Sequence, residues 1–377
     1  MSGMDREKVN KTTAYYDCDV LKKQSGDYYN ATDLLLKNYN DKFYFLGTEK
    51  AIDFQKKLLA YDEENVEFIE IEDNSLDDIF EEVFALISKA KDTEKVILDI
   101  THGFRHQPIS AIFSATLHKF LNDSSLEIIF AKQIVEFNEY EYIYLTEYVD
   151  MTQLSLMLTG FIRTLNFVNT VNVENLNTMA FEKFSKALLS NDFRGIESSY
   201  KNLSATLEKA KTDKKFDHLK EIFEKVEKTV EPFNDFGKKE IYEKYMILAN
   251  LMFDKNYYLL SITYLFEAIR LYSSYSFYKN QIISDIVWQN EETHYYINSD
   301  VIYGMEGKGN KYQNIYNKNK SNFDKVVAEY KKLKNLRNNL THINHKKTQP
   351  NIKGSLHSLL QSIGLLIKDD ILKDLKK

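Results

Sequence analysis

An arginine and a histidine near the C-terminus form the first pair of side chains that could do chemistry. Arg337, Asn338 and His342 stand together in the segment Leu336–His345. Histidine can move protons near neutral pH, and arginine can stabilise the charge that builds on a phosphate during its cleavage. With the 2′-hydroxyl of the substrate as the nucleophile, this pair could cut RNA without a metal and leave a 2′,3′-cyclic phosphate end.

The spacing of this pair limits how it could act. Arg337 and His342 are five residues apart, about 140° around an ideal helix, so they do not share one helical face. A dimer could bring two copies of the pair together across a two-fold axis. A polar helix end is the alternative interpretation. His342 and His345 could share a metal ion, but Glu329 is the only carboxylate in Ala328–Lys353, and we therefore expect no metal site.

A second polar cluster follows an apolar run at Val96–Ile100. The residues of this cluster are Thr101, His102, Gly103, Phe104 and Arg105. Open α/β sheets bind ligands at the carboxyl ends of their parallel strands, and free N–H groups at the start of a helix favour an anion. Gly103 allows close backbone approach, and Arg105 can form two hydrogen bonds to a phosphate. An ordinary polar loop before a helix is the alternative interpretation.

A shorter loop of the same kind occurs earlier in the chain. Gly47 and Thr48 follow a strand-like run and precede a helical pattern. Thr48 could contact a ligand, although a hydroxyl at this position is also typical of a simple N-cap. Two such loops on one sheet edge would line one crevice.

The elements that must position these residues are of two kinds. The first 150 residues alternate β-rich runs with helical patterns, which predicts βαβ units and a largely parallel sheet whose last two strands form an antiparallel pair. The predicted strands are Lys42–Gly47, Val66–Ile71, Lys95–Ile100, Leu126–Ala131 and Glu141–Leu145. The predicted helices are Glu49–Tyr61, Ser75–Lys91 and Gln107–Leu121.

From Met151 onward the pattern predicts helices only. Their expected ranges are Thr152–Val168, Asn175–Leu189, Ile196–Lys211, Phe216–Val230, Lys239–Phe253, Tyr257–Phe277, Asn322–Leu340 and Ile352–Leu375. Tyr303–Asn322 is rich in Gly, Asn and Lys, which predicts a flexible loop. Pro232 is a candidate hinge. We therefore expect an α/β domain over residues 1–150, a helical linker over 151–232 and a helical domain over 233–377.

Composition and charge narrow the class of protein. Gly (12) and Pro (3) are scarce, which argues against a turn-rich all-β fold. Cys18 is the single cysteine, which excludes a disulfide framework within one chain and a cysteine-based zinc site. The start of the chain does not resemble a secretory signal and no run of 18 apolar residues occurs, so we expect a cytoplasmic protein with no membrane association.

The uneven distribution of charge points to the C-terminal cluster. The net charge of −6 argues against a general DNA-coating protein. Lys308–Lys353 nevertheless carries 12 Lys or Arg residues and two acids, whereas Asp62–Glu82 carries 11 acids and no base. A charge run usually marks a solvated face, but the basic run surrounds Arg337 and His342.

Together the two clusters resemble the CARF–HEPN ancillary ribonucleases of type III CRISPR antiviral systems. Asp99–Arg105 is similar to the Asp-x-Thr-His-Gly signature of one subgroup, and Arg337–His342 is similar to the HEPN Arg-Asn-x-x-x-His motif. The order and separation of the two motifs make the pair more specific than either alone. Family members usually begin with a strand that ends in a ligand-binding turn. Here Met1–Asn10 is polar, and Lys11–Asp17 is the nearest candidate.

The resemblance implies a Rossmann-like N-terminal CARF domain, a helical linker and a C-terminal helical HEPN domain. It implies a homodimer or higher oligomer that binds a cyclic oligoadenylate, expected to be cyclic tetra-adenylate, as an allosteric activator, with no other cofactor. The activator contacts would be Thr48, Thr101, His102, Gly103, Phe104 and Arg105. Cleavage of single-stranded RNA would then be carried out by Arg337, Asn338 and His342.

Two other functions fit the same residues. The protein could be a nucleotide sensor that has no nuclease activity and signals through a partner. It could also degrade its own activator as a ring nuclease, which depends on how the activator's 2′-hydroxyls are aligned. The intact Arg337 and His342 pair in a basic segment favours the ribonuclease.

Overall fold

The computed structural model describes ten ranges of the chain, which fall into two compact units. The first unit reaches to Met157 and includes Val168–Thr178, and the second comprises Leu158–Phe167 and Met179–Lys377. The described ranges are 12–15, 27–72, 76–90, 95–103, 106–121, 125–135, 139–168, 173–289, 294–341 and 351–377.

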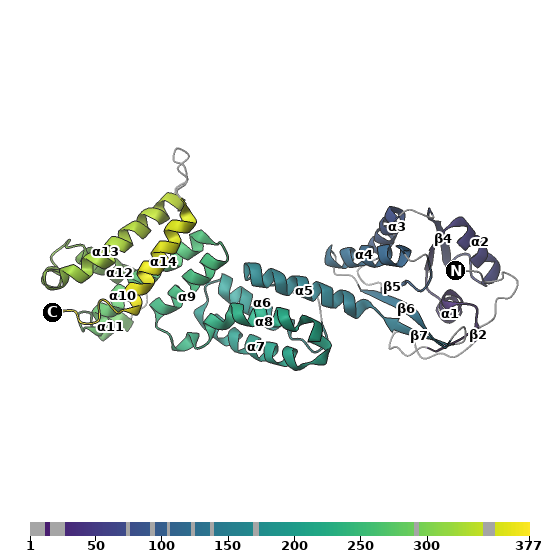
Figure 1. Cartoon of the computed structure of the whole chain (residues 1–377), viewed down its shortest axis with the longest axis horizontal. Coiled ribbons are helices and arrows are strands. Elements are labelled where there is room, and N and C mark those ends of the chain that lie inside the picture. The colour runs from purple at the N-terminus through teal and green to yellow at the C-terminus, as the bar shows by residue number, and fades with distance from the viewer. Residues whose placement is uncertain are drawn as a thin grey trace. The chain divides into compact units, whose positions relative to one another are not determined.

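The first unit alternates strands and helices, as the sequence predicts (Figure 1). Its strands are β1 (Thr12–Tyr15), β2 (Asp27–Tyr28), β3 (Phe43–Gly47), β4 (Val66–Glu70), β5 (Val96–Asp99), β6 (Leu126–Val135) and β7 (Glu139–Tyr144). Its helices are α1 (Ala31–Asn38), α2 (Glu49–Leu58), α3 (Leu76–Lys89) and α4 (His106–Leu121), followed by α5 (Thr146–Thr164), which continues into the second unit.

The strands form two hydrogen-bonded sheets in the described part of the chain. The larger has the order β2-β1-β7-β6-β5, and the smaller pairs β3 with β4. β5 runs parallel to β6, while β6 and β7 form the predicted antiparallel pair. Among the described residues, β3 and β5 belong to different sheets, because β3 pairs with β4 and β5 pairs with β6.

Helix α4 packs through a face of small residues. Ser110, Ala111, Ser114 and Ala115 are buried, and α4 packs against α3. The Ser114 hydroxyl donates to the Phe80 carbonyl at 2.7 Å. α3 contributes Ile79, Val83 and Ile87 at four-residue steps to the same apolar core. α3 thereby fixes the position of α4, and with it the helix start that follows β5.

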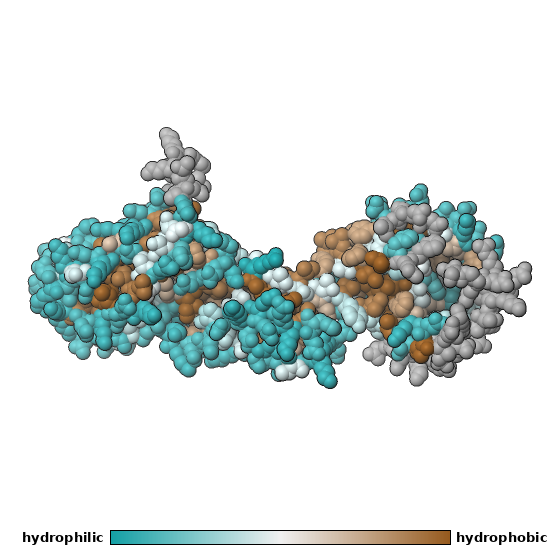
Figure 2. Space-filling view, in the orientation of Figure 1, coloured by the Kyte–Doolittle hydropathy of each residue, from teal (hydrophilic) through white to brown (hydrophobic). Residues whose placement is uncertain are grey.

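The opposite face of α4 is apolar and exposed. Ile109, Phe113, Leu117 and Leu121 recur every four residues and form one stripe, with Phe113 65% and Leu121 64% exposed. Hydrophobic side chains gather over α4 in Figure 2. A continuous apolar stripe at a helix surface is typical of an interaction site rather than of scattered surface residues.

The second unit is helical, as predicted. Its α-helices after α5 are α6 (Thr178–Leu189), α7 (Phe193–Thr212), α8 (Lys220–Val230), α9 (Ile241–Asp254), α10 (Tyr258–Lys279), α11 (Asp285–Gln289), α12 (His294–Met305), α13 (Gln313–Thr341) and α14 (Ile352–Lys368). Three short 3-10 helices lie at Lys214–Leu219, Glu231–Phe233 and Phe236–Lys238. Pro232 lies in the second of these, and the predicted boundary at 232 stays a prediction.

Helix α10 is the centre of the C-terminal part of this unit. It is buried nearly all round, because apolar and small residues occupy every face. Helices α9, α12, α13 and α14 all pack against it, and α13 lies beside α14 (Figure 1). A residue on α10 can therefore reach α12 and α13 from the core.

The predicted flexible loop at Tyr303–Asn322 is too long, because helices occupy both of its ends. α12 continues to Met305, and α13 already begins at Gln313. The polar composition is overridden by tertiary contacts, since Asn319 donates to the Lys376 carbonyl at 2.8 Å and accepts from the Lys376 N–H at 2.9 Å. These two bonds tie the start of α13 to the C-terminal segment.

Several short elements were not predicted, among them α1, α11 and α12. α12 carried a usable signal, since Asn298, Val301, Ile302 and Met305 are buried at helical spacing. Lys11–Asp17, named as the nearest candidate for a first strand, contains β1, and Met1–Asn10 lies outside the described residues. Within the described ranges, no helix combines the length and apolar character needed to cross a bilayer.

Candidate functional site

The loop after β5 is organised by the carboxylate of Asp99. One carboxylate oxygen accepts from the Thr101 backbone N–H at 2.9 Å and from the Thr101 hydroxyl at 2.5 Å. The other accepts from the Tyr142 hydroxyl at 3.4 Å. Because the two Thr101 bonds span only two residues, they fold the chain back at the end of the strand and set where His102 and Gly103 lie.

Thr101 also ties the loop to the neighbouring strand. Its hydroxyl oxygen accepts from the Ala131 N–H of β6 at 2.8 Å. A hydroxyl has one proton and two lone pairs. The proton is donated to Asp99 and one lone pair is taken by Ala131, so the side chain retains one lone pair for a ligand. Thr101 is thus suited to hold the loop rather than to donate to a phosphate.

Gly103 has a backbone conformation that favours glycine. Its φ angle is +124°. A Cβ atom at this position would lie 2.9 Å from the Gln107 side-chain oxygen and 3.5 Å from Pro108. The loop therefore reaches the first turn of α4 by a close approach that side chains would obstruct. Pro108 fits there because the first helical turn needs no N–H from it.

The charges of Asp99 and His102 influence each other. Burial raises the pKa of the Asp99 carboxyl above its ordinary value, although hydrogen bonds from Thr101 and attraction to His102 oppose the rise. Desolvation lowers the pKa of the His102 imidazole, and the attraction of Asp99 opposes that shift. His102 is exposed at the surface as a residue. A lowered pKa leaves its ring neutral at pH 7, able to donate one hydrogen bond and accept another.

Tyr142 connects this loop to a segment that the sequence analysis did not include. The side chain is 1% exposed, and its hydroxyl lies 3.4 Å from both the Asp99 carboxylate and the Ala31 carbonyl. Ala31 is the first residue of α1. The start of α1 therefore lies beside the end of β5. No local sequence motif predicts this contact.

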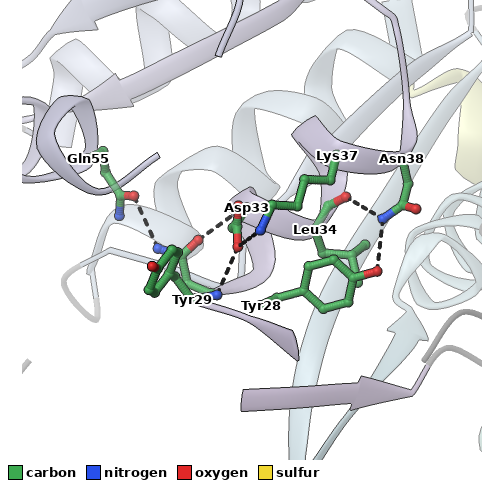
Figure 3. Close-up of polar contacts among 8 residues, drawn as sticks. Tyr28, Tyr29, Asp33, Leu34, Lys37, Asn38 and Gln55 are labelled. Carbon is green, nitrogen blue, oxygen red and sulfur yellow. Dashed lines mark hydrogen bonds and ion pairs between the residues drawn. The ribbon is translucent and has the colours of Figure 1, made fainter. Parts of the chain in front are cut away.

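The start of α1 is itself fixed by a polar network (Figure 3). Asn30 caps the helix by accepting from the Asp33 N–H, and its amide donates to Gln55 of α2 at 3.1 Å. The buried Asp33 carboxylate accepts from the Tyr29 N–H at 2.9 Å and pairs with Lys37 at 2.7 Å. Since these donors satisfy the carboxylate, we interpret the network as structural.

Thr48 is the N-cap of α2, which confirms the simpler interpretation of this residue. Its hydroxyl accepts from the Ala51 N–H at 3.4 Å, so its proton remains available. Glu49 follows in the first turn of the helix. A carboxylate there disfavours a second anion at the same helix end. No such acid stands in the first turn of α4.

The C-terminal candidate site lies at the end of α13. Arg337 and Asn338 are half-buried. The guanidinium carbon of Arg337 lies 4.2 Å from the centre of the Phe266 ring on α10. Phe266 is 5% exposed and is also stacked on Tyr330 at a centroid distance of 5.2 Å. Phe266 was not a candidate in the sequence analysis, because nothing local to Arg337 indicates it.

Three candidate residues lie outside the described part of the chain, namely Phe104, Arg105 and His342. The roles of these residues stay predictions. Among the residues that the structure describes, no group of three or more His, Cys, Asp or Glu side chains is placed to hold a metal ion.

No protein-family model matches this chain, and no curated protein matches it either. The function must therefore be inferred from the two sites and from the motifs that their residues resemble.

Proposed function

We propose that the protein is a metal-independent endoribonuclease that is switched on by a cyclic oligoadenylate, in the manner of the CARF–HEPN enzymes of type III CRISPR defence. The observation that carries the proposal is the loop from Asp99 to Gly103. It stands at the carboxyl end of a parallel strand and directly precedes α4, where an α/β unit of Rossmann-like character would bind a nucleotide.

In this proposal the loop binds the activator through three features. The imidazole of His102, a residue exposed at the surface, hydrogen-bonds to the ribose or phosphate groups, and Gly103 allows the backbone to approach them. The N–H groups at the start of α4 attract the phosphates, helped by Arg105. Thr101 holds the loop through Asp99 and Ala131. Thr48, the N-cap of α2, would donate its hydroxyl proton to the activator.

The chemical step belongs to the C-terminal site. The 2′-hydroxyl oxygen of the substrate attacks the adjacent phosphorus, the bond to the 5′-oxygen of the next nucleotide breaks, and a 2′,3′-cyclic phosphate and a 5′-hydroxyl result. His342 transfers protons in this step, and Arg337 stabilises the negative charge on the phosphoryl oxygens. The +10 balance of Lys308–Lys353, from 12 basic residues and two acids, favours binding of the RNA backbone.

A homodimer accounts for two features that a single chain leaves unexplained. The first is the exposed apolar stripe on α4, formed by Ile109, Phe113, Leu117 and Leu121. A second copy of the chain would bury this stripe. Arg337 and His342 are five residues apart in sequence, about 140° around an ideal helix, and two copies of the pair could meet across a two-fold axis. The dimer is therefore part of the proposal.

The test is cleavage of a fluorescent single-stranded RNA in EDTA, with no activator or with cyclic tri-, tetra- or hexa-adenylate. We expect one ring to switch on cleavage and His342→Ala to abolish it. If a ring binds but no RNA is cut, the protein is a sensor that acts through a partner, and the nuclease assignment is wrong. If the ring is converted to linear products, a ring nuclease is present.

A further inference from the structure

The side chain of Phe266 lies between two residues of α13. Its ring stacks on Tyr330 with a centroid distance of 5.2 Å and an interplanar angle of 30°. The guanidinium carbon of Arg337 lies 4.2 Å from the same ring centre. Tyr330 and Arg337 are seven residues apart, which places them on one helical face about 10.5 Å apart along the axis. One aromatic ring fits in that interval, and Phe266 occupies it.

The packing around Phe266 restricts the conformation of its ring. α10 is buried nearly all round and packs against α13 along its length. The ring itself is 5% exposed, and Tyr330 is 8% exposed. A buried ring held between two residues of a neighbouring helix offers the guanidinium a fixed surface, because core side chains occupy defined rotamers.

A second arginine completes the surroundings of the ring. The guanidinium carbon of Arg270 lies 5.4 Å from the Phe266 centre. Arg270 donates to both carboxylate oxygens of Glu267 at 3.1 and 3.2 Å, and to Ser299 of α12 at 3.0 Å. Its charge is thus balanced locally and it is held to α12. Phe266 therefore faces one arginine that is anchored in the core and one at the candidate site.

We propose that Phe266 is a positioning residue for Arg337. The electron-rich face of the ring attracts the guanidinium and fixes its plane, so that its N–H groups point in a constant direction. This inference rests on the proposed ribonuclease function. It adds a residue of α10 to a site that the motif on α13 alone would define, and it requires no contact between Phe266 and RNA.

The kinetic test replaces the ring without removing the arginine. Phe266→Leu keeps an apolar side chain but loses the aromatic face, and we expect kcat for RNA to fall about 10- to 100-fold while KM changes little. Phe266→Tyr should restore most of kcat, because the face is retained. A wild-type kcat in Phe266→Leu would overturn the proposal.

A matched control separates positioning from loss of core packing. Phe277 lies on the same helix, is fully buried and stacks on Phe323 at 5.8 Å. Phe277→Leu removes a similar ring from the same core, and we expect it to lower the melting temperature but to leave kcat unchanged. If both leucine variants lose kcat equally, Phe266 acts through stability only. Trifluorophenylalanine at position 266 keeps the shape and weakens the ring face, so it should lower kcat even in a fully folded protein.

A readout without RNA tests the contact by itself. The chain has six arginines, so the side-chain Nε–Hε resonances are few, and that of Arg337 is identified by its loss in Arg337→Lys. The ring current of Phe266 should shift this resonance upfield, and Phe266→Leu should remove the shift. If the wild-type protein cuts no RNA but shows this shift, the function fails and the contact stands. If the resonance is the same in wild type and Phe266→Leu, the positioning proposal fails.

Discussion

The two candidate sites are held in different ways. The loop after β5 is fixed by two hydrogen bonds that Thr101 donates to Asp99, two residues away in sequence. Arg337 is held by the ring of Phe266, which comes from another helix. Bonds within one motif, supplemented by the Ala131 N–H and the Tyr142 hydroxyl, hold the first site, whereas the second depends on how α10 packs against α13. A local motif can therefore explain part of the geometry of the first site and cannot explain that of the second.

Of the substitutions considered, Arg337→Ala should have the strongest effect, and it tests the site that depends on the packing of α10 against α13. Arg337→Ala removes the cation that stabilises charge in the transition state, and we expect kcat for RNA to fall about 100- to 1,000-fold. Activator binding should be unchanged, since the substitution lies in the other unit. Arg337→Lys should recover only part of the activity, because an ammonium lacks the planar fork. Isothermal titration with the activator and cleavage kinetics together check both statements, and an Arg337→Ala protein that cuts RNA normally would refute the role.

Thr101→Val should have the next strongest effect, and it tests the site that is held by hydrogen bonds. Thr101→Val keeps the shape of the side chain, but it leaves the Ala131 N–H without its acceptor and the Asp99 carboxylate with one donor fewer. We expect the free energy of unfolding of the first unit to fall by about 2 kcal/mol. Hydrogen exchange at the Ala131 amide should speed up accordingly. Thr101→Ser is the control and should exchange as wild type. Equal protection in the valine variant would show that these bonds do not hold the loop.

Gly103→Ala perturbs the same loop through the backbone. A φ of +124° opposes the substitution, and the Gln107 side-chain oxygen, 2.9 Å from the added Cβ atom, would have to move. We expect a loss of about 1.5 kcal/mol in the free energy of unfolding and weaker activator binding. Gly47→Ala is the comparison, since Gly47 has no positive φ. Chemical denaturation measures the free energy of unfolding. A Gly103→Ala protein as stable as wild type would contradict the prediction that alanine is strained at this φ.

Much of the fold could be predicted because its signals are local. The strands and helices from β3 to β7 were placed from apolar runs of the right period, and each lies where it was expected. The start of α13 could not be predicted, because it is stabilised by the bonds of Asn319 to Lys376, far along the chain. The same holds for the strand order, which depends on pairing between distant segments.

The candidate sites divide in the same way. The residues from Thr101 to Gly103 could be singled out because a strand, a glycine and a helix start follow one another in sequence. Tyr142 and Phe266 could not, since they reach their sites from β7 and α10 and no motif surrounds either of them in the sequence. A sequence motif indicates the residues that could act chemically. The residues that hold them in place are found only from the tertiary packing.

The charge of Asp99 gives a pH dependence for the first site. Burial raises the pKa of its carboxyl in the folded protein above the ordinary 3.8, so the folded state binds the proton more tightly than the unfolded state. As the pH rises from 3.8 through the folded-state pKa, the wild type should lose stability relative to Asp99→Asn. Denaturation of both proteins from acid to neutral pH measures the difference. A difference that stays constant, or that grows in favour of the wild type, would contradict the raised pKa.

The smallest expected effect comes from Tyr142. Its hydroxyl makes two long contacts of 3.4 Å, to Asp99 and to Ala31, and it has one proton to share between them. Tyr142→Phe should cost about 0.5 kcal/mol in the free energy of unfolding, well below Thr101→Val. Parallel urea titrations rank the two variants. If Tyr142→Phe were the more damaging of the two, the loop would be held from β7 rather than by its own motif.

The most direct test of the central claim separates the two sites in one experiment. RNA cleavage in EDTA and activator binding are measured side by side for the wild type, Gly103→Ala and Arg337→Ala, over a concentration series of the activating ring. We expect Arg337→Ala to bind the ring as tightly as wild type but not to cut RNA. We expect Gly103→Ala to need more ring to reach the wild-type rate. Equal cleavage with and without every ring, or cleavage that survives in Arg337→Ala, would contradict the central claim.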